Sequence, residues 1–101
     1  MYIIWDRDHS DPDGAQLLYA TDDLQQAKAE FKKLDLDHPY DGGDIQLCVG
    51  RIDNDAFVEL IRQHMLDDDT IFDALAMLRL RGVYTELYYN DGSDDNDDID
   101  F

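Results

Sequence analysis

The chain has 101 residues, and its 25 acidic side chains outnumber the eight basic ones, which gives a formal net charge of −17. This is far more than the roughly 2 to 8 charges that keep a small domain soluble, and the like charges weaken the folded state by repelling one another. The charge excludes direct binding of nucleic acid, whose phosphates are held by Lys and Arg, and it predicts a basic partner.

Composition also bounds the class of protein. Apolar residues make up 44% of the chain, enough for one domain with a hydrophobic core. Cys48 is the only cysteine, so no internal disulfide forms, and its place in an apolar run predicts core packing. No segment has the pattern of a signal peptide or the roughly 18 apolar residues of a membrane span. We therefore expect a soluble, cytoplasmic protein.

The first half of the chain predicts two strands, a helix and a third strand. Tyr2–Trp5 and Ala15–Ala20 are β-rich runs on either side of a loop of turn-forming residues, which indicates a hairpin. Thr21 is a suitable N-cap for a helix. The apolar face of that helix is predicted to be Leu24, Ala27, Phe31 and Leu34, at helical spacing. After a loop over residues 35–44, the run Ile45–Ile52 predicts another strand.

The second half predicts two helices and a final strand. Asp53 or Asn54 begins the first helix, and the aspartates at 67–69 end it and begin the second. The buried face of the first helix is predicted to be Phe57, Ile61 and Met65, with Val58 and Leu60 alongside. The buried face of the second is predicted to be Ile71, Leu75 and Leu78. Gly82 is a C-terminal stop signal, and Val83–Tyr89 is rich in β-branched and aromatic residues, as in a strand.

The order β-β-α-β-α-α-β predicts an α+β domain, with a small mixed or antiparallel sheet and helices on one face. We place this compact domain in residues 1–89. Residues 90–101 contain six aspartates and no basic residue, which predicts a disordered acidic tail.

Metal and catalytic sites are not supported by residue spacing. His9, His38 and His64 lack the spacing of zinc ligands. If Gly14 were the sixth residue of an EF-hand calcium loop, Ala20 would be the twelfth, where a carboxylate is required. Weak calcium binding by clustered aspartates stays an alternative. No nucleophile with a matching base and no glycine-rich phosphate loop can be assembled. We expect no enzyme, no cofactor and no active-site cleft.

The acidic residues are grouped, and 22 of the 25 are aspartates, whose short side chains hold the charge close to the backbone. At about one charge per 1.7 Å, 17 charges match roughly 30 Å of duplex DNA, about the size of a folded 100-residue domain. We assign partner binding to these groups. They comprise Asp6, Asp8, Asp11, Asp13, Asp22, Asp23, Asp35, Asp37, Asp41, Asp44, Asp67, Asp68, Asp69, Asp73, Asp97 and Asp98, with Phe101, and Asp53 and Asp55 form a further pair. Salt adaptation and a merely solvated acidic face are the alternatives.

Small size, extreme acidity, an α+β body and the lack of catalytic residues together resemble the DNA-mimic inhibitors of phages and mobile elements, such as anti-restriction and anti-CRISPR proteins. The resemblance implies a non-enzymatic inhibitor, in the host cytoplasm, that occupies the basic nucleic-acid-binding surface of a nuclease or of a restriction or CRISPR complex. The aspartates would then stand in for phosphates and form charge-assisted pairs with Lys and Arg.

The end of the sequence offers a second resemblance. The run Asp97-Asp98-Ile99-Asp100-Phe101 is similar to the tail of bacterial single-stranded DNA-binding proteins, in which aspartates precede Ile-Pro-Phe. This resemblance implies an alternative function, an acidic adaptor that docks on replication or repair proteins through its terminal phenylalanine. Asp100 replaces the proline of that family, which favours a tail that contributes charge alone.

The charge generates a first prediction. Attraction between oppositely charged surfaces is screened within about 10 Å at 0.1 M salt, so we expect association with the basic partner to slow steeply as the salt concentration rises. Association rates measured by surface plasmon resonance over a salt series test this expectation. An affinity that does not change with salt would contradict it and would indicate an apolar interface.

Overall fold

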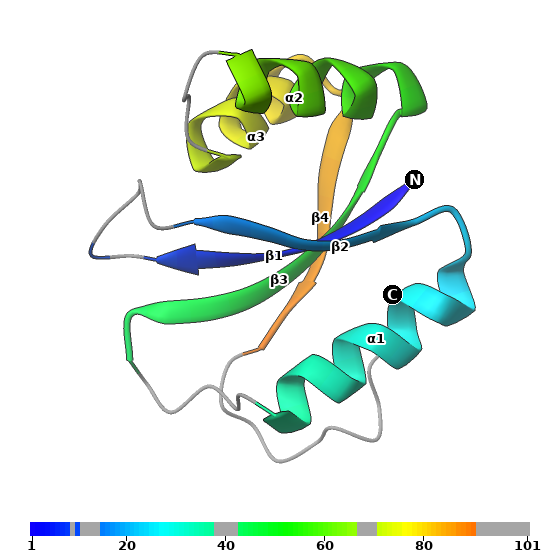
Figure 1. The fold of residues 1–101 in the computed structure, drawn as a ribbon, viewed down its shortest axis with the longest axis vertical. Coiled ribbons are helices and arrows are strands. Elements are labelled where there is room, and N and C mark those ends of the chain that lie inside the picture. The colour runs from blue at the N-terminus through cyan, green and yellow to red at the C-terminus, as the bar shows by residue number, and fades with distance from the viewer. Residues whose placement is uncertain (9, 11–14, 38–42, 67–70, 91–101) are drawn as a thin grey trace.

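The computed structural model describes residues 1–8, 10, 15–37, 43–66 and 71–90, and of residues 64–66 it describes the backbone alone. Its elements follow the predicted order and confirm the α+β class (Figure 1). They are β1 (Tyr2–Asp8), β2 (Gln16–Thr21), α1 (Leu24–Asp37), β3 (Ile45–Ile52), α2 (Asn54–Leu66), α3 (Ile71–Leu80) and β4 (Tyr84–Tyr89).

The four strands form one antiparallel sheet with the order β2-β1-β3-β4. β1 and β2 pair as the predicted hairpin, and β3 lies between β1 and β4. Residues 46–50 of β3 are buried in succession, as in a strand that is covered on both faces. A bulge interrupts the pairing of β3 with β4, because Val49 pairs with Tyr88 and Gly50 with Glu86, which leaves Leu87 without an opposite residue.

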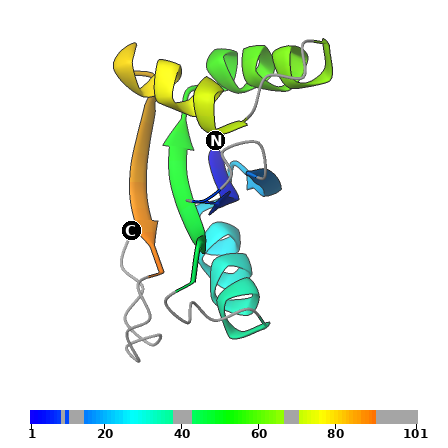
Figure 2. The same ribbon diagram turned by 90° about the vertical axis from the view of Figure 1, so that its left-hand side faces the viewer.

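The prediction that the helices cover one face of the sheet is wrong. Ile3 and Trp5 of β1 belong to a buried cluster with residues of α2 and α3, whereas Ile4 packs with Phe31 of α1 in a second cluster. Figure 1 shows α1 on one side of the sheet and α2 and α3 on the other, and Figure 2 shows the same separation after a quarter turn. Successive strand residues point to opposite faces, so the apolar run of β1 requires a helical cover on both.

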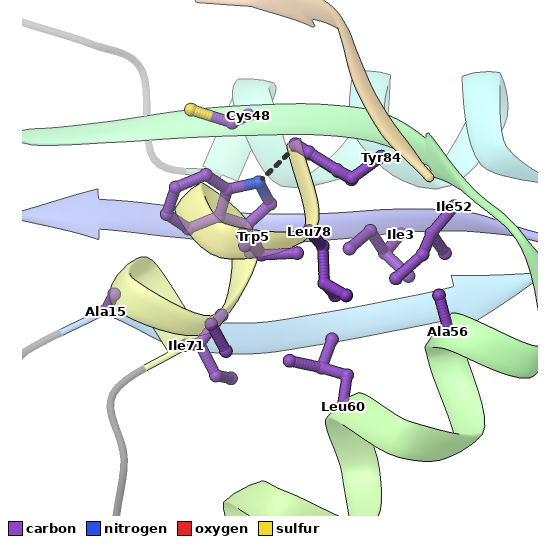
Figure 3. Packing of buried hydrophobic residues seen from close by; sticks show 12 residues of the cluster. Ile3, Trp5, Ala15, Cys48, Ile52, Ala56, Leu60, Ile71, Leu78 and Tyr84 are labelled. Carbon is purple, nitrogen blue, oxygen red and sulfur yellow. Dashed lines mark hydrogen bonds between the residues drawn. The ribbon is translucent and has the colours of Figure 1, made fainter. Parts of the chain in front are cut away.

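The larger cluster joins the sheet to α2 and α3 (Figure 3). Its buried members are Ile3, Trp5, Ala15, Cys48, Ile52, Ala56, Leu60, Ile71, Ala74, Leu75, Leu78 and Tyr84. This confirms the predicted buried face of α3 and the core position of Cys48. The predicted face of α2 is only partly correct. Leu60 is buried as expected, but Phe57 and Ile61 are half-buried, Val58 is exposed, and Ala56 is buried instead. The side chain of Met65 lies outside the described part of the chain.

The start of α1 also differs from the prediction. Thr21 does not cap the helix, because it still pairs with Tyr2 as the last residue of β2. The cap is Asp23, whose side chain accepts hydrogen bonds from the backbone N–H of Gln25 at 2.9 Å and of Gln26 at 3.4 Å. Thr21 supports this cap, since its hydroxyl accepts a hydrogen bond from the backbone N–H of Asp23 at 3.1 Å.

Gly82 ends α3, as predicted. Its φ of 79° lies in the left-handed region that favours glycine. The backbone N–H of Gly82 donates to the carbonyl of Arg79, and that of Val83 donates to the carbonyl of Leu78, both at 3.1 Å. These are the two hydrogen bonds of a Schellman motif, and they turn the chain directly into β4.

The boundary that we placed between residues 89 and 90 needs a correction. Asn90 is buried and belongs to the domain. Its backbone N–H donates to the carbonyl of Leu47 at 3.0 Å, and its side-chain oxygen accepts the backbone N–H of Leu47 at 2.9 Å. Its carbonyl accepts the side-chain amide of Gln46, and its own amide donates to Asp35 at 2.9 Å. Asn90 thus extends the pairing of β4 with β3 and ties it to α1.

This network predicts where the chain can be shortened. A protein that ends at residue 90 should keep the stability of the domain, whereas one that ends at residue 89 leaves buried polar groups of Leu47 and Asp35 without partners. We expect the shorter protein to lose about 1–3 kcal/mol in free energy of unfolding. Urea denaturation of the two proteins gives the difference, and equal midpoints would contradict the role of Asn90.

A second prediction concerns the contact between Gly50 and Tyr84. A Cβ atom at position 50 would overlap the Tyr84 ring, whose hydroxyl accepts a hydrogen bond from the Trp5 indole N–H at 3.0 Å. We expect Gly50→Ala to destabilise the domain by about 1–3 kcal/mol, because the ring must move out of its place in the core. In a Tyr84→Ala background the same change should cost much less, and equal costs in both backgrounds would contradict the contact.

Candidate functional site

Exposed aspartates lie at both ends of the sheet. At one end Tyr2 of β1 pairs with Thr21 of β2 on one side and with Arg51 of β3 on the other, so β2 and β3 finish together. Each then leads into a helix, and both helices begin on the right-hand side of Figure 1. We call the four exposed aspartates at these helix starts the first acidic end: Asp22, Asp23, Asp53 and Asp55.

The other end of the sheet carries a second group. β1 ends at Asp8, which pairs with Ile45 at the start of β3, and the last turn of α1 lies close by through the contact of Asp35 with Asn90. We call Asp8, Asp37 and Asp44 the second acidic end; Asp37 and Asp44 are exposed and Asp8 is half-buried. The eight residues of β3 rise about 3.3 Å each, so the two acidic ends are roughly 25 Å apart.

Two of the predicted partner-binding aspartates serve the fold instead. Asp35 is buried, with 5% of its surface exposed, and it accepts the Asn90 amide, so it cannot reach a partner. The half-buried Asp6 accepts a hydrogen bond from the backbone N–H of Gln16 at 2.6 Å. Burial raises the pKa of Asp6 above its ordinary value, against the effect of that hydrogen bond. The sequence predicted that both aspartates would be exposed, because aspartate is seldom buried.

Of the other aspartates predicted to bind a partner, one more is described by the structure. Asp73 is exposed in the first turn of α3. The remaining predicted positions lie outside the described residues: Asp11, Asp13, Asp41, Asp67, Asp68, Asp69, Asp97, Asp98 and Phe101.

The backbone fixes where the charges of the first acidic end lie. The side chain of Asp23 is fixed by the hydrogen bond that it accepts as the N-cap of α1, and Asp55 lies in the first turn of α2. A negative charge at a helix start is stabilised by the helix dipole, so these aspartates are compatible with the fold despite the repulsion between them. Asp53 immediately precedes α2, and its carbonyl accepts the backbone N–H of Phe57 at 2.8 Å.

Most arginines of the described structure are engaged with glutamates. Three ion pairs join described residues: Arg7 and Arg79 both contact Glu86, at 3.2 and 3.9 Å, and Arg81 contacts Glu59 at 3.2 Å. Two positive charges lie at the first acidic end. Arg51 pairs with Tyr2 there, and the N-terminus is beside it, because the carbonyl of Met1 accepts a hydrogen bond from the backbone N–H of Ile52 at 2.9 Å. The three lysines lie along α1, between the two ends.

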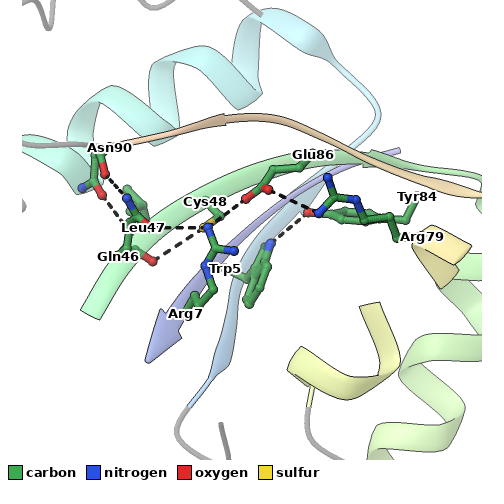
Figure 4. A network of polar contacts seen from close by, with 9 residues as sticks. All are labelled: Trp5, Arg7, Gln46, Leu47, Cys48, Arg79, Tyr84, Glu86 and Asn90. Carbon is green, nitrogen blue, oxygen red and sulfur yellow. Dashed lines mark hydrogen bonds and ion pairs between the residues drawn. The ribbon is translucent and has the colours of Figure 1, made fainter. Parts of the chain in front are cut away.

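A pocket of about 320 Å³ opens between α3 and the sheet, where we expected no cleft. Its walls are mostly apolar and come from β1, α3 and β4. The lining residues are Trp5, Arg7, Phe72, Leu75, Ala76, Arg79, Leu80, Tyr84 and Glu86. Figure 4 shows Arg7 and Arg79 on either side of Glu86, near the hydrogen bond between Trp5 and Tyr84.

Glu86 is the centre of this polar group. Arg7 donates to Glu86 at 3.2 Å and to the side-chain oxygen of Gln46 at 3.3 Å, and its guanidinium carbon lies 5.7 Å from the centre of the Trp5 ring. The buried Nε of Arg7 has no hydrogen-bond partner among the described residues. Two arginines share one carboxylate, so this pocket carries one net positive charge in a strongly negative protein.

Cys48 and Tyr84 beside the pocket are held in their protonated forms. Burial raises the pKa of the Cys48 thiol to about 12, and burial likewise raises the pKa of the Tyr84 hydroxyl. The thiolate is the nucleophilic form of cysteine, so Cys48 is inert at neutral pH.

Within the described ranges, no three His, Cys, Asp or Glu residues lie together as a metal site would require. In the same part of the chain, no helix combines the length and apolar character of a membrane span. No family model matches the chain, and no curated protein or solved structure matches it either.

The raised pKa of Cys48 predicts a loss of stability at alkaline pH. Between the ordinary pKa of 9.0 and about 12, the unfolded chain releases the thiol proton while the native protein keeps it, so the free energy of unfolding falls as the pH rises. Urea denaturation across this window measures the fall. The Cys48→Ala variant should show a shallower fall than the parent, and equal slopes would contradict the assignment.

Proposed function

We propose that this protein is a non-enzymatic inhibitor that binds the basic, nucleic-acid-binding surface of another protein, a nuclease or a restriction or CRISPR complex, by imitating the charge of DNA. The observation that carries the proposal is the arrangement of exposed aspartates at the two acidic ends. Asp22, Asp53 and Asp55 at the first end and Asp37 and Asp44 at the second are exposed to solvent, where a basic partner can reach them.

Spacing supports this function. The two acidic ends are roughly 25 Å apart, and the longest dimension of the molecule is 37 Å. A DNA-binding protein of similar size contacts phosphates over a comparable length, since the duplex carries about one charge per 1.7 Å. A partner that contacts both acidic ends would therefore find carboxylates at a separation over which it normally contacts the phosphates of a duplex.

Rigidity supports it as well. Asp22 and Asp23 follow directly on β2, Asp53 and Asp55 surround the start of α2, and a short side chain leaves little freedom beyond the backbone. Charges that are fixed before binding lose less conformational entropy when they pair with Lys and Arg, so more of the interaction contributes to affinity. The function would be carried out in the cytoplasm of a host cell, where such nucleic-acid-binding complexes act.

A displacement experiment tests the proposed function. The partner is captured from cell lysate on the immobilised protein and identified by mass spectrometry, and the purified pair is then titrated with a fluorescent duplex. We expect nucleic acid and this protein to exclude each other from the partner. Simultaneous binding of both would contradict mimicry.

Charge-neutralising variants locate the surface. We expect Asp22→Asn with Asp55→Asn at the first acidic end, and Asp37→Asn with Asp44→Asn at the second, each to weaken partner binding by roughly tenfold. The matched control is Glu30→Gln, which removes one charge from the middle of α1 between the ends and is compared with the single variants Asp22→Asn and Asp37→Asn. If Glu30→Gln weakens binding as much as these single variants, net charge alone and not its placement determines recognition.

A further inference from the structure

The pocket between α3 and the sheet has the size and the lining of a site for a small molecule. Its volume of about 320 Å³ is at the lower end of the range for ligand pockets, which are mostly apolar with a few polar groups. Trp5, Leu75 and Tyr84 in its lining are buried, whereas Arg79 and Leu80 are exposed. The pocket therefore has an apolar inner part and a mouth that carries a charge.

The inner part is suited to a flat apolar group. Trp5 and Phe72 meet edge to face with their ring centres 6.3 Å apart. One turn further along α3, the pocket is lined by Ala76, which has only a methyl group to fill the space. An aromatic ring placed here would pack against Trp5 and Phe72 and would remove apolar surface from water.

Arg79 is available to a ligand at the mouth of the pocket. Its contact with Glu86 is 3.9 Å long, which is an ion pair but longer than a hydrogen bond, and it is the one polar contact of Arg79 within the described residues. The side chain is 66% exposed, so it can turn toward a ligand without disturbing the core. A guanidinium group can hold a carboxylate through two parallel hydrogen bonds.

Arg7 is fixed in place and sets the charge of the ligand. It donates to Glu86 and Gln46 and lies over the Trp5 ring. Arg7 and Arg79 share the single carboxylate of Glu86, so the pocket has one positive charge in excess. A monocarboxylate balances this charge, whereas a phosphate, with a charge closer to two, would exceed it.

The acidic ends are too far from this site to prevent the binding of an anion at physiological salt. Glu86 pairs with Gly50 of β3. Along the chain, Asp53 is three residues from Gly50 and Asp44 is six, or roughly 10 and 20 Å at the rise of a strand. On α3, Asp73 is six residues from the arginine at the mouth, or about 9 Å along the helix axis. Charges are screened within about 8 Å at 0.15 M salt, so a direct contact with this arginine outweighs these repulsions.

We propose that this pocket binds a small aromatic monocarboxylate, with the ring against Trp5 and Phe72 and the carboxylate on Arg79. The ligand fills the apolar inner part and balances the excess positive charge. The site is separate from the acidic ends and needs no second protein, so it goes beyond the proposed inhibitor function.

Trp5 provides a single signal for the test, because it lines the pocket and is the only tryptophan of the chain. The cross-peak of its indole N–H is followed by proton–nitrogen NMR while 3-phenylpropionate is added to the full-length protein at about 0.15 M salt. We expect a saturable shift of this cross-peak, with a dissociation constant on the order of 1 mM for a ligand of this size.

Two related compounds separate the effect of the ring from that of the charge. The neutral amide of the same acid, 3-phenylpropanamide, should bind about two- to fivefold more weakly, which is the usual contribution of an exposed ion pair. Acetate carries the charge without the ring and should cause no saturable shift over the same range of concentration.

Variants of the lining locate the site. Arg79→Ala should lower the affinity for the acid to that for the amide and leave the amide nearly unaffected. The matched control Arg62→Ala removes the same charge from an exposed position on α2 outside the pocket and should change neither affinity. Ala76→Leu places a larger side chain at an exposed position of the lining and should weaken the binding of both compounds severalfold.

Three results would each overturn the proposal. The first is the absence of a saturable shift up to about 20 mM of the acid. The second is binding of the amide that equals or exceeds that of the acid, which would show that the net negative charge of the protein outweighs Arg79. The third is an equal loss of affinity for the acid in Arg79→Ala and Arg62→Ala. These titrations contain no protein partner, so their failure leaves the proposed inhibitor function untouched, and failure of the displacement experiment leaves the pocket untouched.

Discussion

The fold depends on one constraint: the two central strands are apolar on both faces. Ile3, Ile4 and Trp5 follow one another in β1, and residues 46–50 of β3 are all buried. The faces of the sheet are therefore largely covered by α1 on one side and by α2 and α3 on the other, and the charges that lie on them, such as Arg7 and Glu86, are paired. Many of the exposed aspartates accordingly lie where strands end and helices begin. The acidic ends thus result from the way the core is built, whatever partner they serve.

The two acidic residue types have different uses in this molecule. Glu86 and Glu59 have longer side chains and reach arginines on other elements, so they act as internal connectors. Aspartates lie at caps, first turns and strand ends, where a short side chain can accept backbone N–H groups. Hydrogen bonds to the backbone, and the helix dipole for Asp55 and Asp73 in the first turns of α2 and α3, offset part of the repulsion among them.

Local signals in the sequence predicted most of the elements. The bounds of β3, the buried residues of α3 and the stop at Gly82 were correct because each depends on residues close together in the chain. Whether helices cover one face of the sheet or both could not be predicted from such local signals, because it depends on how strands far apart in the sequence pair. The buried position of Ala56 was missed because an alanine contributes little to a hydrophobic pattern.

The candidate site was predictable to a smaller degree. Exposure of Asp22, Asp23, Asp37 and Asp44 followed from their positions beside predicted helices and strands. Asp35 is indistinguishable from its exposed neighbours until Asn90 is placed beside it, and these two residues are 55 positions apart. The pocket is less accessible still. Trp5 and Tyr84 meet only after β1, β3 and β4 have paired, across 79 positions of sequence.

The bulge at Leu87 has a consequence for how one short strand is used. In a regular strand, Tyr84, Glu86 and Tyr88 would all point to the same face. The extra residue reverses the alternation, so Tyr84 and Glu86 face α3 while Tyr88 packs edge-on against Phe31 of α1, with ring centres 5.4 Å apart. A single inserted residue thereby divides an edge strand between two separate cores. Such a division makes the two halves of the molecule mechanically dependent on one another, because neither helical layer can loosen without pulling on a strand that the other layer also holds.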